Sequence, residues 1–190
     1  MASRNLKSTK HKSTSGPDAI AMLKADHRKV ESLFKAFEKA KAKDPTRKQK
    51  IAEDVCMELS IHALLEEEMF YPLFRGEVDD KLLDEAYVEH DSAKVMIAEI
   101  MAASPQDDFY DAKVTVLSEE IKHHVKEEER AIKGIFAQAK RSDVDMNELG
   151  QRMAERKKEL KMRFTSEGLP PPETRTLSGA KLCYGQPLAA

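Results

Sequence analysis

Four of the six histidines in this chain fall on the apolar side of a helical pattern, where an imidazole is costly unless both ring nitrogens find partners. In the stretch IHALLEEEMFYP, residues 61–72, His62 and Glu66 stand one helical turn apart and share a face with apolar side chains. His124 and Glu128 repeat this spacing further along the chain. Neutral imidazole and carboxylate are common metal ligands, so these residue types at this spacing predict a metal site.

The other two histidines of the pattern are His27 and His90, each placed singly on an apolar face. One buried histidine taken alone is commonly satisfied by hydrogen bonds. Four imidazoles and two carboxylates at one depth cannot easily satisfy one another, whereas metal ions would accept the lone pairs and balance the charge. Six ligands exceed what one tetrahedral zinc takes, so we expect two metal ions about 3.5–4 Å apart. Nitrogen and carboxylate without thiolate suit iron or manganese well and zinc less specifically.

The elements that must position these ligands are four helices. Apolar residues and the four histidines recur at steps of three and four in the runs 20–37, 51–73, 83–100 and 114–135. Asp44-Pro45 and Ser104-Pro105 each read as an N-cap followed by proline at the first helical position. Four helices with short links predict an all-α fold, an antiparallel up-down four-helix bundle over residues 17–140.

The first two helices match the last two at an offset of 62 or 63 residues, which pairs His27 with His90 and His62 with His124. Pro72 likewise matches Gly134, and these helix-breaking residues are expected to mark where the ligand-bearing part of each helix stops. The repeat predicts a bundle with a pseudo-twofold axis whose halves give the same polar set to the centre.

The structure of the residues outside the bundle is predicted from their composition. Residues 1–16 read as a disordered basic arm, and 141–165 as an additional helix with a thin apolar stripe, which could dock on the bundle, pair with a copy or project. Residues 166–190, rich in Pro and Gly, are expected to form an extended tail. A protein partner could bind through the additional helix and tail.

The overall composition restricts the partners and the compartment. A formal net charge of −2 over 190 residues gives no argument for nucleic acid or a membrane surface. The sequence has no secretory signal, and its two cysteines, Cys56 and Cys183, suggest no disulfide framework. We therefore expect a cytoplasmic protein.

The quoted motifs resemble one family. His27 in DHRKVESLF, His62 and Glu66 in HALLEEEMFYPLF, His90 in VEHD, and His124 and Glu128 in HVKEEE together are similar to the hemerythrin-like family, over roughly residues 18–140. The resemblance implies a bundle holding a non-haem di-iron centre, joined by an oxo or hydroxo bridge and two carboxylates. The implied metal ligands are His27, His62, Glu66, His90, His124 and Glu128.

The chain departs from the oxygen-carrying members of that family. Ala86 stands where carriers have a further histidine, and the last motif is His-x-x-x-Glu rather than His-x-x-x-x-Asp. A coordination position could thus be open or filled by Tyr87, which otherwise reads as a core tyrosine. The candidates for extra ligands or hydrogen-bond partners, or else for solvated surface carboxylates, are Glu58, Glu120 and Glu31. Glu67 and Glu129 fall off the apolar face and are expected to be solvated or to bond near the site.

The resemblance implies O2 binding, for storage, delivery or sensing, as the first function. An enzyme that processes peroxide or NO, similar to a catalase or peroxidase, is the alternative, and an iron store or iron sensor is the third. The expected ligand is O2, another diatomic molecule or peroxide, and zinc or manganese could replace the two irons. Whether the chain is an enzyme and what oligomer it forms stay open.

Overall fold

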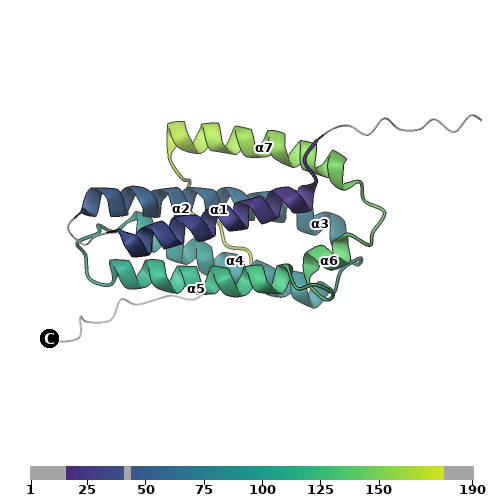
Figure 1. The fold of residues 1–190 in the computed structure, drawn as a ribbon, viewed down its shortest axis with the longest axis horizontal. Helices are drawn as coiled ribbons and strands as arrows, with labels where there is room; N and C mark the ends of the chain where they lie inside the picture. The colour runs from purple at the N-terminus through teal and green to yellow at the C-terminus, as the bar shows by residue number, and fades with distance from the viewer. Residues whose placement is uncertain (1–15, 41–43, 178–190) are drawn as a thin grey trace, which may run out of the picture.

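The computed structural model describes residues 16–40 and 44–177, so the basic arm predicted for residues 1–16 falls almost wholly outside the described part. Four antiparallel helices form the bundle (Figure 1): α1 Ala19–Lys39, α2 Pro45–Leu65, α4 Asp80–Met101 and α5 Tyr110–Glu128. The predicted all-α bundle is confirmed. None of the described helices is long and apolar enough to cross a lipid bilayer.

The histidines lie between two apolar cores. One cluster, which includes Leu23, Leu65 and Phe136, fills the end of the bundle near α6, residues Ile135–Ala139. The other, which includes Phe34 and Leu117, fills the opposite end. The polar side chains of the layer between them are buried, so any charge there must be balanced locally.

Helix α2 does not end regularly but passes into a π-helix, η1 Glu66–Phe70, and then into the short α3, Tyr71–Phe74. The Tyr71 N–H bonds the carbonyl of Glu66, five residues back. Because a π-turn contains more residues than an α-turn, the positions that face the core after this turn are shifted by one residue along the chain. Phe70 and Phe74 are buried, whereas Leu73, expected in the core, is 44% exposed.

Pro72 does not break this helical path, although the last candidate ligand of the path, Glu66, precedes it as expected. The proline lies in the first turn of α3, where its missing N–H is tolerated. The predicted cap at Asp44 is present and accepts the Arg47 N–H at 3.0 Å. The equivalent prediction for Ser104-Pro105 is wrong, because α5 begins only at Tyr110.

The fourth helix is shorter than predicted and ends at Glu128. Ile132, expected on its buried face, is 73% exposed. At Gly134 a Cβ would stand 2.5 Å from the Glu128 carbonyl and 2.6 Å from the backbone of Arg130. Only glycine allows the chain to fold back this closely on the end of α5 before α6 begins.

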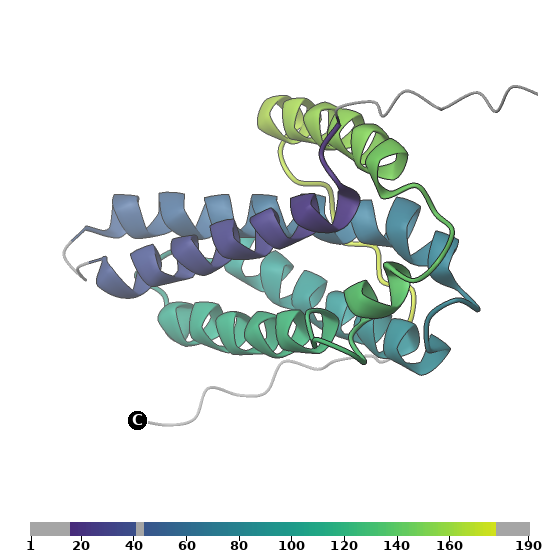
Figure 2. The same ribbon diagram turned by 45° about the vertical axis from the view of Figure 1, so that its right-hand side comes forward.

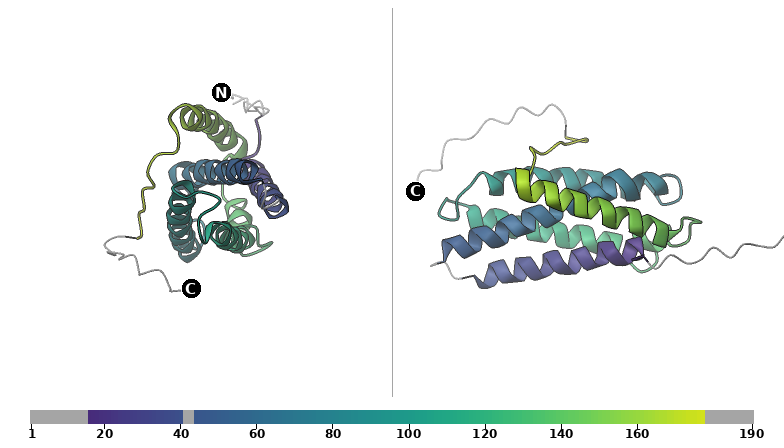
Figure 3. Two further views of the ribbon diagram at one scale, coloured as in Figure 1. Left: turned by 90° about the vertical axis from the view of Figure 1, so that its left-hand side faces the viewer. Right: turned by 90° about the horizontal axis from the view of Figure 1, so that it is seen from above.

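The additional helix is α7, Met146–Glu167, and it docks along α1 and α2 outside the bundle (Figures 2 and 3). Its thin apolar stripe is buried, at Leu149, Met153, Leu160 and Phe164. Arg156 pairs with Glu68 at 3.0 Å, and Lys161 pairs with Glu58 at 3.3 Å. Of the three arrangements considered, docking on the bundle is the one observed.

Residues 168–177 form an extended segment, here called the strap, which runs from α7 to the side of α4 (Figure 3). Asp91, only 1% exposed, fixes its end. One carboxylate oxygen accepts the N–H of Arg175 at 2.7 Å and the N–H and hydroxyl of Thr176 at 2.6 and 2.8 Å. Although burial opposes the charge, these donors and Lys94 lower the pKa of Asp91 to about 2. The rest of the predicted tail, 178–190, lies outside the described residues.

Replacing this carboxylate should release the strap. Asp91→Ala removes the acceptor for several hydrogen bonds to a charged group, each worth about 1.5–3 kcal/mol. We expect hydrogen exchange at the amides of 175–177 to accelerate at least about tenfold. Asp84→Ala, on the exposed side of the same helix, is the matched control. Equal exchange in both variants would show that Asp91 does not hold the strap.

Candidate metal centre

Each long helix of the bundle contributes one buried histidine, and all four aim Nε2 at the same point. The Nε2 atoms of His27 and His62, from α1 and α2, are 3.1 Å apart. Those of His90 and His124, from α4 and α5, are 3.2 Å apart. The histidines thus form two pairs, one from each half of the repeat.

Two carboxylates lie between these pairs. Glu66 Oε2 is 3.1 Å from Nε2 of His62 and 3.4 Å from Nε2 of His90, so it touches one histidine of each pair. Glu128 Oε2 approaches the remaining two histidines in the same way, at 3.3 and 3.5 Å. Each carboxylate therefore contacts both pairs, which is the arrangement that a bridging ligand requires.

The spacing of these atoms suits metal coordination. Two donors about 2.1 Å from one ion, at tetrahedral or octahedral angles, lie roughly 3.0–3.4 Å apart. The contacts among the four Nε2 atoms and the two Oε2 atoms, at 3.1–3.5 Å, come close to this spacing. The potential donor atoms form two groups whose members lie within 4.8 Å of one another: His27, His62, Glu66 and Glu128 in one, and Glu66, His90 and His124 in the other. Within the described chain, the buried Glu66 Oε1 and Glu128 Oε2 accept no hydrogen bond, an uncommon state for carboxylate oxygens. The donor set thus fits two cations.

The electrostatics of the site also favour positive charge. Burial alone would lower the pKa of His62, but the charge of Glu66 and the proximity of Asp26 and Glu128 raise it to about 10. Burial likewise opposes the charged form of His90, yet Glu66 and Glu67 raise its pKa to about 9. Without a metal these imidazoles hold protons, and a metal ion would displace those protons on binding.

A carboxylate faces the other ring nitrogen, Nδ1, of every histidine in the site. The four pairs are His27 with Glu129 at 2.8 Å, His90 with Glu67 at 3.0 Å, His124 with Glu89 at 2.8 Å and His62 with Asp26 at 3.8 Å. The first three are hydrogen-bonded, and the last is an ion-pair distance, too long for a hydrogen bond. A carboxylate accepts only, so in the three hydrogen-bonded pairs Nδ1 carries the hydrogen and the Nε2 lone pair is left for a metal ion.

These outer carboxylates follow the internal repeat, although sequence reasoning found only half of them. Glu67 and Glu129 were considered as bonding partners near the site, whereas Asp26 and Glu89 were missed. The sequence feature that could have revealed the two missed acids is their position directly before the histidine of the first and third helices. The two acids are 63 residues apart, as the internal repeat requires. Each such acid serves the histidine of the next helix, because it lies on the flank of its own helix that faces that neighbour.

The phenol in the site is Tyr71, not the candidate Tyr87. The Tyr71 hydroxyl is 2.9 Å from Glu128 Oε1, 3.2 Å from Glu66 Oε2 and 3.5 Å from His90 Nε2. Tyr87 instead packs edge-on against the Tyr71 ring, with centroids 5.4 Å apart. Burial and the two carboxylates raise the pKa of Tyr71 well above its usual value, so it is a neutral donor. The sequence hid this role because only the π-helix turns position 71 inward.

The three further glutamate candidates lie outside the ligand groups that the described residues form. Glu58 is buried but pairs with Lys29 at 2.6 Å. Glu120 accepts a long hydrogen bond of 3.4 Å from Ser92. Glu31 lies on the surface, where it pairs with Lys35 at 2.7 Å. Their carboxylates serve ion pairs and surface contacts.

Comparison with known proteins agrees with this geometry. A curated "DNA nickase" from Nostoc sp. is 30% identical over 111 residues, which is 58% of this chain and 31% of that protein, so the chain spans about a third of this relative's length. A crystal structure of a hemerythrin HHE cation-binding domain-containing protein from Mycobacterium kansasii has the same fold, with a TM-score of 0.66, 21% identity and coverage of 80% of this chain and 95% of that one. The family model "Hemerythrin HHE cation binding domain" matches residues 18–136. The chain therefore belongs to the hemerythrin HHE cation-binding domain family.

Proposed function

We propose that this metal-binding protein holds two iron ions and binds O2 at them, for storage, delivery or sensing. Each iron would take two histidines, His27 with His62 and His90 with His124. Glu66 and Glu128 would bridge the two ions. When bound, the irons supply the electrons and the open coordination positions that O2 needs.

The observation that carries this proposal is that both carboxylates contact both histidine pairs. Such sharing suits two nearby ions and not two independent sites. With two histidines and two shared carboxylates, each ion retains positions for a small ligand. Iron is the proposed metal because the donors are imidazole and carboxylate without thiolate, in a family that binds cations.

A second candidate, catalase- or peroxidase-like turnover of peroxide, is favoured by the Tyr71 hydroxyl. Its raised pKa keeps the proton on the phenol, and the hydroxyl lies among the carboxylate oxygens of both bridging groups. From there it would donate a hydrogen bond or a proton to an oxygen ligand. A positioned proton donor of this kind contributes about 10²–10⁴-fold to a reaction.

Loss of a ligand should remove metal. After anaerobic reconstitution with ferrous iron, we expect two irons per chain, and His62→Ala and Glu128→Ala should each lose at least one of them. Elemental analysis measures the content, and spectra on adding O2 report binding. Glu31→Ala, which alters only a surface pair, is the control. Full iron content in both ligand variants would refute the assignment, and stoichiometric zinc in protein purified from cells would exclude O2 chemistry.

The tyrosine separates the two candidate functions. Tyr71→Phe should keep both irons and, if the protein turns over peroxide, lower the rate of H2O2 consumption by roughly tenfold or more. Tyr87→Phe removes the neighbouring hydroxyl and should leave that rate unchanged. Reversible O2 binding with negligible turnover of peroxide in the unaltered protein would instead support the first function.

A further inference from the structure

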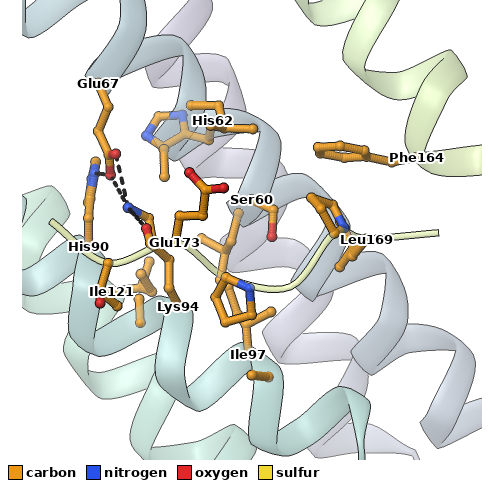
Figure 4. Close-up of a pocket in the computed structure, with 18 of the residues that line it drawn as sticks. Ser60, His62, Glu67, His90, Lys94, Ile97, Ile121, Phe164, Leu169 and Glu173 are labelled. Carbon is orange, nitrogen blue, oxygen red and sulfur yellow. Dashed lines mark hydrogen bonds and ion pairs between the residues drawn. The ribbon is translucent and has the colours of Figure 1, made fainter. Parts of the chain in front are cut away.

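A cavity of about 860 Å³ connects the four histidines to the surface. It passes between α2 and α4, by Leu59, Ile97 and Ala98, and reaches the strap and α7 at Leu169 and Phe164. In Figure 4, His62 and His90 lie at one side of this space while Phe164 and Leu169 lie at the other. The strap thus forms a wall of a space whose inner end is the candidate metal centre.

This cavity is much larger than a diatomic ligand requires. A water molecule occupies about 30 Å³ in the liquid, and O2 is of similar size. A volume of 860 Å³ instead falls in the range of roughly 300–1,000 Å³ that is typical of sites for organic ligands. Its walls carry aliphatic side chains and the prolines 170–172, along which an apolar chain would pack favourably, and also the carboxylates of Asp26, Glu67, Glu68 and Glu173.

The cations that line the cavity point to the polar part of the ligand. Lys94 and Arg156, both on the cavity wall, are already paired with carboxylates, at 3.1 Å from Asp91 and 3.0 Å from Glu68. Arg163 also lines the cavity, and its guanidinium stacks on the Phe164 ring at 5.2 Å. Among the described residues, no carboxylate forms an ion pair with Arg163. A cation beside an apolar space is complementary to an anionic head group with an apolar chain.

We propose that the cavity is a binding site for a long-chain carboxylic acid, with the carboxylate at Arg163 and the apolar chain running between α2 and α4 toward the histidines. The site requires no metal, since Arg163 and the apolar walls belong to the chain itself. It gives α7 and the strap a role that the metal centre does not demand: they provide the cation and the outer wall.

The test is a fluorescence titration of the full chain, metal-free and iron-loaded, with the fluorescent fatty acid cis-parinaric acid. Saturable binding of one probe per chain is expected in both forms. Ala98→Trp should fill the cavity and weaken binding by about tenfold or more. Val95→Trp, on the exposed side of the same helix, is the matched control and should bind as the unaltered protein does. Circular dichroism and iron content verify that each variant is folded.

The position of the head group has its own test. Arg163→Glu should weaken binding of the acid by about tenfold while leaving that of its methyl ester nearly unchanged, because only the acid carries charge. Arg152→Glu, exposed on the same helix, controls for net charge. Absence of saturable binding, or equal affinity in Ala98→Trp and Val95→Trp, would overturn the proposal, and an equal loss for acid and ester would overturn the head-group assignment. Binding to the metal-free chain separates these outcomes from failure of the proposed iron chemistry.

Discussion

The structure depends on two carboxylates placed where water cannot reach them. Glu66 and Glu128 are 0% and 1% exposed and lie between two apolar cores. An unpaired carboxylate in such a place costs many kcal/mol, so positive charge must be supplied from within the bundle. His62 and His90 supply it as protonated rings, or cations bound by the histidines would supply it. In the protein without metal, the buried carboxylates raise the pKa of His62 and His90, so these rings hold protons. Bound metal ions would supply the positive charge in place of those protons.

Each half of the repeat supplies one of these carboxylates and two of the histidines, but the chain continues differently after the two carboxylates. After Glu66 the helix widens into a π-turn that brings Tyr71 into the site; after Glu128 the helix stops and Gly134 lets the chain fold back. The residue that corresponds to Tyr71 in the repeat, at an offset of 62, is Lys133, which lies in an exposed turn. A symmetric ligand set therefore receives a single phenol from one side. The two carboxylates are not equivalent, because the Tyr71 hydroxyl is nearer to Glu128 than to Glu66.

Periodicity and spacing in the sequence were enough to predict the bundle and to select six residues that the structure brings together. Helical faces determine which residues point inward, and this information is local. The failures arose where the helical period changes. A regular period placed Leu73 and Ile132 in the core, but the π-turn and the turn before Gly134 expose both. The same change of phase concealed Tyr71. The outer partners Asp26 and Glu89 were missed because they depend on contacts between helices, which a one-dimensional pattern does not contain.

The charged side chains around the centre form layers of alternating sign, and cations of α7 and the strap belong to the outermost layer. Two carboxylates lie at the middle, the histidines surround them, and an outer set of carboxylates faces the Nδ1 atoms. These outer acids are themselves partly buried and need cations. For Asp26 the cation is Lys157 of α7, and for Glu67 it includes Arg175 of the strap at 3.3 Å. A bundle without α7 and the strap would leave these two acids with fewer cations, and their charge would act on His62 and His90 directly. Helix α7 and the strap therefore belong to the electrostatic surroundings of the centre, even though they contribute no ligand to it.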